Sequence, residues 1–161
     1  MRRENEFLLT LVRGKLRKDG LAPPLALSAG LDWGSFVSLC EWHNVTPLAF
    51  RALTSVLNGA VPPAVVNRLR GLHHSNAARS LLLATELTRI LKAFESAGVP
   101  AYPFKGPALS VMLYGDPARR QSKDLDILIP GETLHRAVKV LDGQGYRARN
   151  ELAGPRLAAH R

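Results

Sequence analysis

Apolar residues recur at helical spacing through the first 98 residues of the chain. The first stripe, with a period near 3.6 residues, consists of Phe7, Leu8, Leu11, Val12 and Leu16. A second helix is predicted over residues 33–40, with Asp32 as its N-cap. A third helix is predicted to begin with Thr46 as N-cap and Pro47 as its first residue, and to stop at residues 58–59, an Asn-Gly pair. The pattern therefore predicts a helical N-terminal half.

A fourth and longer helical pattern opens at Pro62-Pro63 and runs to Gly98. An unbroken helix over this stretch would extend about 50 Å at 1.5 Å per residue. Because that is long for a chain of 161 residues, we expect a bend near Gly71 or in the polar residues 73–76.

At Val99 the pattern changes to strands that alternate with helices. The predicted elements are a strand (99–104), a helix (108–114), a strand (124–129), a helix (131–145) and a third strand (145–148). The prolines of the first strand favour an edge position. The expected fold class is therefore α+β, with a helical module over residues 1–98 followed by an α/β unit over residues 99–161.

Composition excludes several classes of protein. With 46% hydrophobic residues the chain can form a core, which disordered chains cannot. Its one cysteine, Cys40, excludes an intrachain disulfide framework. The sequence contains no apolar run of about 18 residues and no secretory signal, so we expect a cytoplasmic protein without a membrane partner. The net charge of +9 predicts an anionic partner, and its even spread along the chain does not choose among nucleic acid, nucleotide and membrane surface.

Two acidic residues stand out in the second predicted strand. Asp124 and Asp126 are two positions apart, so on a strand their side chains point to the same side, about 6–7 Å apart. Two carboxylates this close repel each other unless a cation lies between them. Mg²⁺ binds one or two carboxylates together with phosphate oxygens. The pair is therefore a candidate metal site.

Basic and glycine residues surround this acid pair in the sequence. Gly106 lies at a strand-to-helix turn, where backbone can approach a ligand and the helix N-terminus favours an anion. Lys105 could reach a phosphate. The nearby basic residues are Arg119, Arg120 and Lys123. Each feature alone is more often an ordinary turn or a solvated loop, but their order favours a nucleoside triphosphate site. His43, beside Trp42, is expected to pack at a helix end.

Several motifs in this stretch carry a resemblance to a known family. They are Lys105-Gly106, Leu113-Tyr114, Asp116-Pro117 and Arg120-x-x-x-Asp124-Leu-Asp126-Ile-Leu. Weaker similarities in the helical half are Asp32-Trp33, His43-Asn44-Val45-x-Pro47-Leu48, Val61-Pro62, Glu86-Leu87-x-x-Ile90-Leu91 and Ala97-Gly98-Val99. Over about residues 30–147 the chain resembles the bacterial uncharacterised nucleotidyltransferase family of the DNA polymerase β-like superfamily.

The resemblance implies a fold and a reaction. Residues 99–161 would form part of a polymerase β-like nucleotidyltransferase core. Asp124 and Asp126 would be the catalytic residues and would bind Mg²⁺. Lys105, Gly106 and Arg120 would bind the nucleotide. The implied reaction moves a nucleoside monophosphate from an NTP to the hydroxyl of an acceptor that the sequence does not name, and releases pyrophosphate.

The resemblance also implies a third carboxylate from a later strand. The acidic residues after Asp126 are Glu132, Asp142 and Glu151, and none fits that position well. We therefore expect a C-terminally truncated core. Two alternatives stay open: a catalytically inactive nucleotidyltransferase-like binding module that lacks the third carboxylate, and a basic nucleic-acid-binding helical protein. The second is not favoured, because the chain has no recognisable reading motif or aromatic-rich platform.

Overall fold

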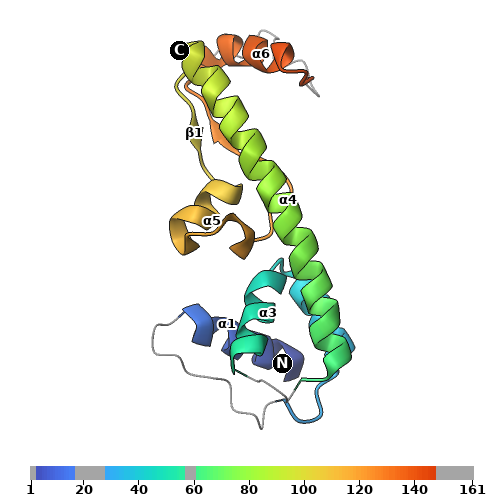
Figure 1. The fold of residues 1–161 in the computed structure, drawn as a ribbon. Coiled ribbons are helices and arrows are strands. Elements are labelled where there is room, and N and C mark those ends of the chain that lie inside the picture. Colours follow the sequence, from blue (N-terminus) through green and yellow to red (C-terminus); the bar gives the residue numbers. More distant parts are fainter. Residues whose placement is uncertain (1–2, 17–27, 57–60, 148–161) are drawn as a thin grey trace.

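Helix α4 is the spine of the molecule, and the other elements lie along it (Figure 1). The computed structural model describes residues 3–16, 28–56 and 61–147. Helix α4 (Pro63–Ser96) has 34 residues and confirms the long predicted helix. It is continuous through Gly71 and residues 73–76, and Figure 1 shows no sharp kink there, so the expected bend is not observed within α4. Packing against other elements at both ends stabilises the helix through this polar stretch.

Three helices pack around the first part of α4. They are α1 (Arg3–Leu16), α2 (Trp33–Trp42) and α3 (Thr46–Val56). Asp32 caps α2 as predicted, because its Oδ1 accepts hydrogen bonds from the N–H groups of Gly34 and Ser35 at 3.0 and 3.2 Å. Hydrogen bonds from the Ser35 hydroxyl and from these N–H groups lower the pKa of the Asp32 carboxyl.

The predicted cap of α3 is wrong. Thr46 is itself the first residue of the helix, and its buried Oγ1 has no hydrogen-bond partner among the described residues. The helical bonding starts one residue earlier, because the N–H of Ala49 donates to the carbonyl of Val45 at 2.9 Å. The predicted stop at residues 58–59 lies outside the described residues.

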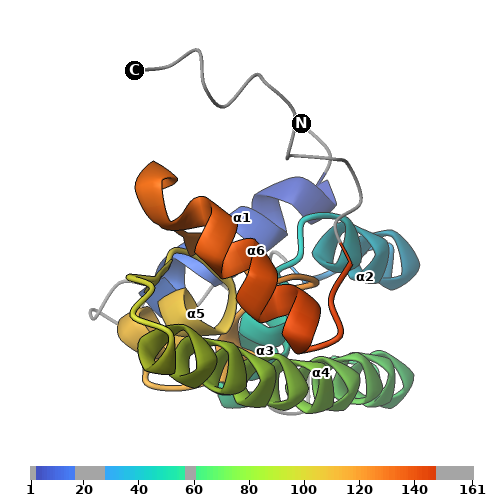
Figure 2. The ribbon, with the colours of Figure 1, turned by 90° about the horizontal axis from the view of Figure 1, so that it is seen from above.

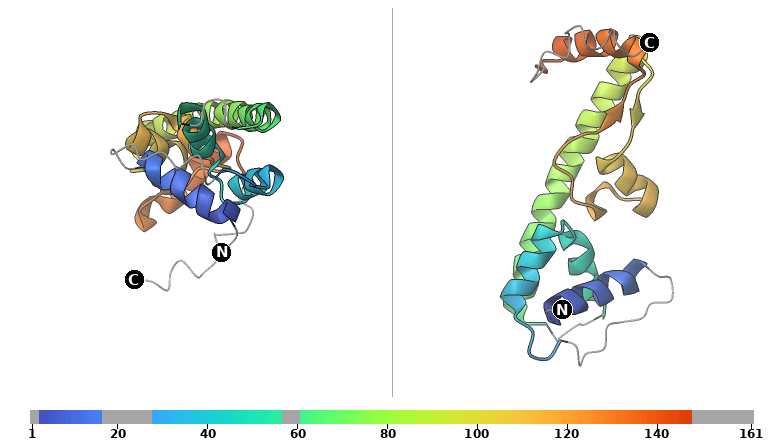
Figure 3. Two further views of the ribbon diagram at one scale, coloured as in Figure 1. Left: turned by 90° about the horizontal axis from the view of Figure 1, so that it is seen from below. Right: turned by 180° about the vertical axis from the view of Figure 1, so that it is seen from behind.

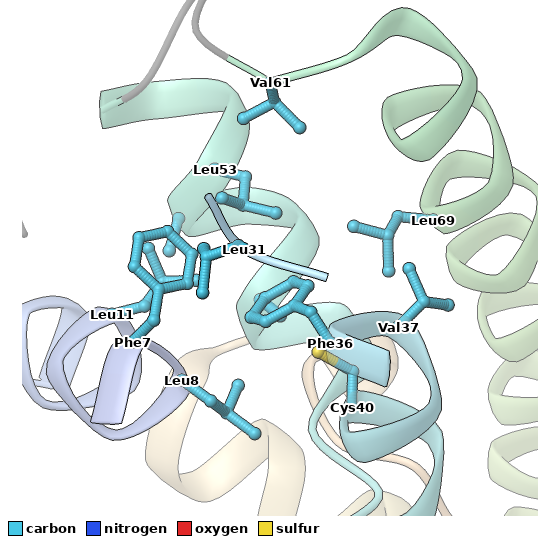
Figure 4. Packing of buried hydrophobic residues seen from close by; sticks show 12 residues of the cluster. Phe7, Leu8, Leu11, Leu31, Phe36, Val37, Cys40, Leu53, Val61 and Leu69 are labelled. Atoms are coloured by element: carbon cyan, nitrogen blue, oxygen red, sulfur yellow. The ribbon is translucent and has the colours of Figure 1, made fainter. Parts of the chain in front are cut away.

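The larger hydrophobic cluster joins these helices (Figure 4). The rings of Phe7, Trp33 and Phe36 pack edge to face, with centroids 5.4 to 6.0 Å apart. Leu69 reaches the same cluster from α4. Cys40 is fully buried in it, and burial raises the pKa of its thiol to about 12. The cysteine therefore serves as a small apolar core residue, as expected.

The predicted strands are present but much shorter. Strands β1 (Tyr102–Pro103) and β2 (Ile127–Leu128) form a two-stranded antiparallel sheet. Tyr102 pairs with Leu128, and Pro103 pairs with Ile127. The third predicted strand is not observed over residues 145–147, and residue 148 lies outside the described residues. The predicted α/β unit thus has one small sheet, and the described structure as a whole is mostly helical.

The remaining elements are α5 (Gly106–Tyr114), η2 (Pro117–Arg119), η3 (Gly131–Thr133) and α6 (Leu134–Gly143). Seen from above, α6 lies across the end of α4 (Figure 2). A second, smaller cluster forms there from Ile90, Phe94, Val99 and Ala137. The view from behind shows α5 between the sheet and helices α1 to α3, on one side of α4 (Figure 3). Helix α4 therefore contributes to both clusters.

None of the described helices is suited to cross a membrane. None of them combines the length and the apolar character that a membrane span needs.

Candidate functional site

A cleft with a volume of about 470 Å³ is lined by residues from both halves of the chain. One wall is the α2–α3 corner, which we define as His43, Asn44, Val45 and Leu48. The opposite wall contains Lys105, Gly106, Tyr114 and residues 119–124, together with Asp126. The structure thus brings the five site residues predicted from the sequence into one cleft: Lys105, Gly106, Arg120, Asp124 and Asp126.

The acid pair lies just before the second strand rather than within it. Asp124 and Asp126 are exposed, whereas β2 starts at Ile127. The prediction that both acids lie on a regular strand is therefore wrong in its boundaries. Asp126 still continues the pairing, because its carbonyl accepts a hydrogen bond from the N–H of Phe104 at 2.9 Å. The backbone of Asp126 is thereby fixed beside the segment that leads to Lys105 and Gly106.

Gly106 is required by the backbone on two counts. Its φ of +62° lies in the left-handed region, which side chains other than glycine rarely adopt. A Cβ at this position would lie 3.2 Å from the carbonyl oxygen of Asp124. The first turn of α5 therefore packs directly against the backbone of the acid pair. The start of α5, where helix N–H groups favour an anion, thus borders the same cleft as the carboxylates of Asp124 and Asp126.

Two buried polar side chains hold the segment between α5 and the acid pair. The Nδ2 of Asn76, on α4, donates to the carbonyls of Ala118 at 2.9 Å and Arg120 at 3.4 Å. The Oγ of Ser110, on α5, donates to the carbonyl of Asp116 at 2.7 Å and accepts from the N–H of Arg120 at 3.2 Å. Both residues are buried. They fix residues 116–120 from two sides.

The sequence did not predict that Asn76 and Ser110 fix residues 116–120. Asn76 stands in the polar stretch where a bend was expected, and it instead binds a loop more than 40 positions later in the chain. An asparagine among polar neighbours in a helix gives no indication of which distant carbonyls it meets. Ser110 lies within an apolar stretch, and this polar residue in an apolar run was the one available signal.

The basic residues of the cleft differ in how they are paired. Arg119 contacts the carboxylate of Asp116 at 3.4 Å. The buried Nη1 of Arg120 has no hydrogen-bond partner among the described residues. The Nζ of Lys105 lies 5.3 Å from the centre of the Phe104 ring, and Lys105 and Lys123 are both exposed. Lys105, Arg120 and Lys123 are thus the cationic groups that could face an anionic ligand.

The α2–α3 corner is the part of the cleft that sequence reasoning did not place there. His43 is at the end of α2 as expected, yet it is exposed and lines the cleft. Asn44 follows with a φ of +55°, the one positive φ of a non-glycine residue in the described part of the chain. The helical half therefore contributes a wall of the site.

The two candidates for a third acid that the structure describes do not line the cleft. Glu132 lies in η3 and Asp142 in α6, and neither lines it. Asp142 lies 3.7 Å from the guanidinium of Arg147. Glu151 lies outside the described residues. Within residues 3–16, 28–56 and 61–147, no group of three His, Cys, Asp or Glu side chains could hold a metal ion.

Comparison with known protein families identifies a matching family. A family model described as uncharacterised nucleotidyltransferase matches residues 29–160. The match includes both walls of the cleft, from His43 to Asp126. The chain matches no curated protein and no solved structure. Because the family match covers most of its length, the chain belongs to the uncharacterised nucleotidyltransferase family.

Proposed function

We propose that the protein transfers a nucleoside monophosphate from an NTP to the hydroxyl of an acceptor, with Mg²⁺ held by Asp124 and Asp126. The observation that carries this proposal is the packing of the start of α5 against the acid pair, through Gly106. Carboxylates for a cation and helix N–H groups for an anion meet in one cleft. A metal-bound triphosphate is the ligand that satisfies both.

The donor set of the acid pair suits Mg²⁺. This ion takes one or two carboxylates and completes its coordination with water and phosphate oxygens. Asp124 and Asp126 are both exposed to the cleft, so their oxygens are accessible. When bound, Mg²⁺ would neutralise charge on the phosphates and help to align them. Two carboxylates are enough for one such ion.

The phosphates would lie between the start of α5 and the basic side chains. The N–H groups of the first turn of α5 attract negative charge. Lys105 and Lys123 are exposed on the same wall and add point charges. The backbone of Arg120 is held on both sides, because its N–H donates to the Oγ of Ser110 and its carbonyl accepts from the Nδ2 of Asn76. The guanidinium of Arg120, whose buried Nη1 lacks a hydrogen-bond partner among the described residues, would lie beside the triphosphate.

The reaction itself would depend mainly on positioning and charge stabilisation. The acceptor oxygen forms a bond to the α-phosphorus as the bond from that phosphorus to the bridging oxygen breaks. Pyrophosphate leaves with the electron pair, and the hydroxyl proton passes to solvent or to a nearby base. Lys105 and Arg120 would stabilise the negative charge that moves onto the leaving pyrophosphate.

Thermal unfolding in the presence of Mg²⁺ and each NTP tests the proposal. Binding to the folded protein raises Tm, and the shift should disappear when Asp124→Asn and Asp126→Asn are combined. Glu132→Gln is the matched control, because it removes one acid of the same half outside the cleft. No shift with any NTP, or an equal shift in the double variant, would contradict the proposal.

A second candidate is an inactive binding module with the same ligand. The observation that favours it is that Asp124 and Asp126 are the only carboxylates lining the cleft among the described residues. Such a module would show the same Mg²⁺-dependent shift but would release no pyrophosphate. Pyrophosphate release from an NTP, abolished by Asp126→Asn, would exclude it.

A further inference from the structure

We propose that the α2–α3 corner binds the nucleoside half of the NTP, opposite the wall that would hold its phosphates. This inference rests on the proposed function, since it assigns the other half of the same ligand. It gives the helical half of the chain a direct role in substrate binding. Three features of the molecule support this role: the continuity of the cleft, the chemistry of the corner and the backbone of Asn44.

One continuous cleft includes both walls and is large enough for a nucleotide. Its 470 Å³ extends from Asp124 and Asp126 to His43 and Asn44 without a break. Pockets for a single small ligand are about 300–1,000 Å³, so the cleft holds about one nucleotide. The sugar and base are covalently linked to the α-phosphate and must lie close to it. With the phosphates on the acidic and basic wall, the corner is the remaining surface of the same cleft.

The corner is suited to a neutral, planar group. The residues it contributes carry no carboxylate and no Lys or Arg. Val45 and Leu48 are partly buried and offer apolar surface to the face of a base. The Asn44 amide can both donate and accept hydrogen bonds, as the edges of nucleobases require. His43 adds a second polar group at the rim of the cleft.

The backbone of Asn44 explains why its amide is available. The N–H of Val45 donates to the carbonyl of Cys40 at 2.9 Å, and that of Asn44 to the carbonyl of Glu41 at 3.1 Å. These bonds close the end of α2 around a left-handed residue, where glycine is the usual choice. Asparagine adopts the same backbone, and Asn44 is exposed and lines the cleft. Asn44→Gly therefore removes the amide and retains the turn.

The test compares a nucleotide with its phosphates alone. Calorimetry on the full chain gives the affinities for the four Mg·NTPs and for Mg·tripolyphosphate. We expect the tightest NTP to bind more tightly than tripolyphosphate. Asn44→Gly should weaken that NTP about tenfold, as expected for the loss of one hydrogen bond to a ligand. Tripolyphosphate binding should stay unchanged in this variant.

Leu82→Ala is the control, because Leu82 is an exposed residue of α4 that does not line the cleft. It should leave the ratio of NTP to tripolyphosphate affinity unchanged. An unchanged ratio in Asn44→Gly, or the same fall of the ratio in Leu82→Ala, would overturn the nucleoside site. If tripolyphosphate still binds with Mg²⁺ and requires Asp124 and Asp126, the phosphate half of the proposed function survives that result. If neither ligand binds the unaltered chain, the proposed function fails together with the inference.

Discussion

The two ends of α4 are stabilised in different ways. Among the described residues, the cluster at the helical end contains twelve buried side chains, and the cluster under the small sheet contains four. The first includes three aromatic rings in mutual contact, whereas the second has a single buried aromatic ring, that of Phe94. Apolar burial is the main source of folding stability. The helical end should therefore be the more stable of the two.

The end that carries the acid pair depends more on polar contacts and on backbone geometry. Asn76 and Ser110 hold the loop before Asp124, and Gly106 packs against the backbone of Asp124. The sheet nearby leaves Tyr102 and Leu128 60% and 55% exposed. The cleft therefore joins a well-packed wall to a wall fixed by a few specific contacts. Changes to those few contacts should affect the site more than changes of similar size elsewhere.

The largest expected effect comes from the aromatic cores. Phe36→Ala should lower the free energy of unfolding by about 5 kcal/mol, and Phe94→Ala by about 3 kcal/mol, the two ends of the usual range for such substitutions. Both side chains are buried, with 0% and 1% exposed. The difference arises because the smaller cluster can relax around the lost ring. Urea unfolding measures both values, and an equal or larger loss for Phe94→Ala would break the comparison.

Asn76 allows the polar contacts to be tested next. Asn76→Ala leaves two partly buried carbonyls, of Ala118 and Arg120, without their donor and should cost about 2–3 kcal/mol. Asn67→Ala is the matched control on the same helix, because Asn67 is exposed, and it should change stability by less than about 0.5 kcal/mol. Urea unfolding gives both values. Similar values for the two variants would show that Asn76 does not hold the loop.

Substitution of two glycines can distinguish the effect of backbone strain on stability from the effect of the contact with Asp124 on binding. Gly106→Ala and Gly115→Ala both place a Cβ at positive φ, which costs about 1–2 kcal/mol. A Cβ at Gly115 has open space, whereas one at Gly106 approaches the carbonyl of Asp124. Both variants should therefore lose stability, but only Gly106→Ala should also weaken Mg·NTP binding. Equal effects on binding would mean that the contact with Asp124 does not matter to the site.

The smallest expected effect on stability comes from the hydrogen bonds that join α4 to Tyr146, just after α6. Hydrogen bonds from Arg89 and from the Tyr146 hydroxyl lower the pKa of Glu86 from 4.5 to about 2. Because this pKa is lowered in the folded state, the ionised Glu86 carboxylate stabilises the folded protein fully above about pH 4.5. This contribution to the free energy of unfolding is lost as the pH falls toward 2. Glu86→Gln should flatten the pH dependence of Tm in this window. An unchanged profile would show that the network does not stabilise this end.

The sequence predicted the helices of this molecule better than its strands. Helical stripes such as Phe7, Leu8 and Leu11 identify buried faces directly, because helix formation depends on local periodicity and packing. The strands shrink to two residues each, since pairing requires a partner that local sequence does not reveal. Thr46 was misassigned because Val45 already starts the helical bonding.

In the candidate site, too, the sequence predicted the local features and not the long-range contacts. The acid pair, Lys105, Gly106 and Arg120 could be identified, because spacing and turn chemistry within one short segment carry that signal. The α2–α3 corner and Asn76 could not, because they come from parts of the chain that are distant in sequence. Only the three-dimensional packing of α3 and η2 against α4 brings the α2–α3 corner to the cleft and Asn76 to the loop before Asp124. Contacts over such distances leave no pattern in a single sequence.

The central claim is that the acid pair binds a metal-bound nucleotide. Its most direct test is calorimetric titration of an NTP into the full chain, with and without Mg²⁺, for the unaltered protein and for Asp124→Asn combined with Asp126→Asn. We predict that Mg²⁺ tightens binding to the unaltered protein and makes no difference to the double variant. Binding that is equally tight without Mg²⁺, or a Mg²⁺ effect that persists in the double variant, would contradict the claim.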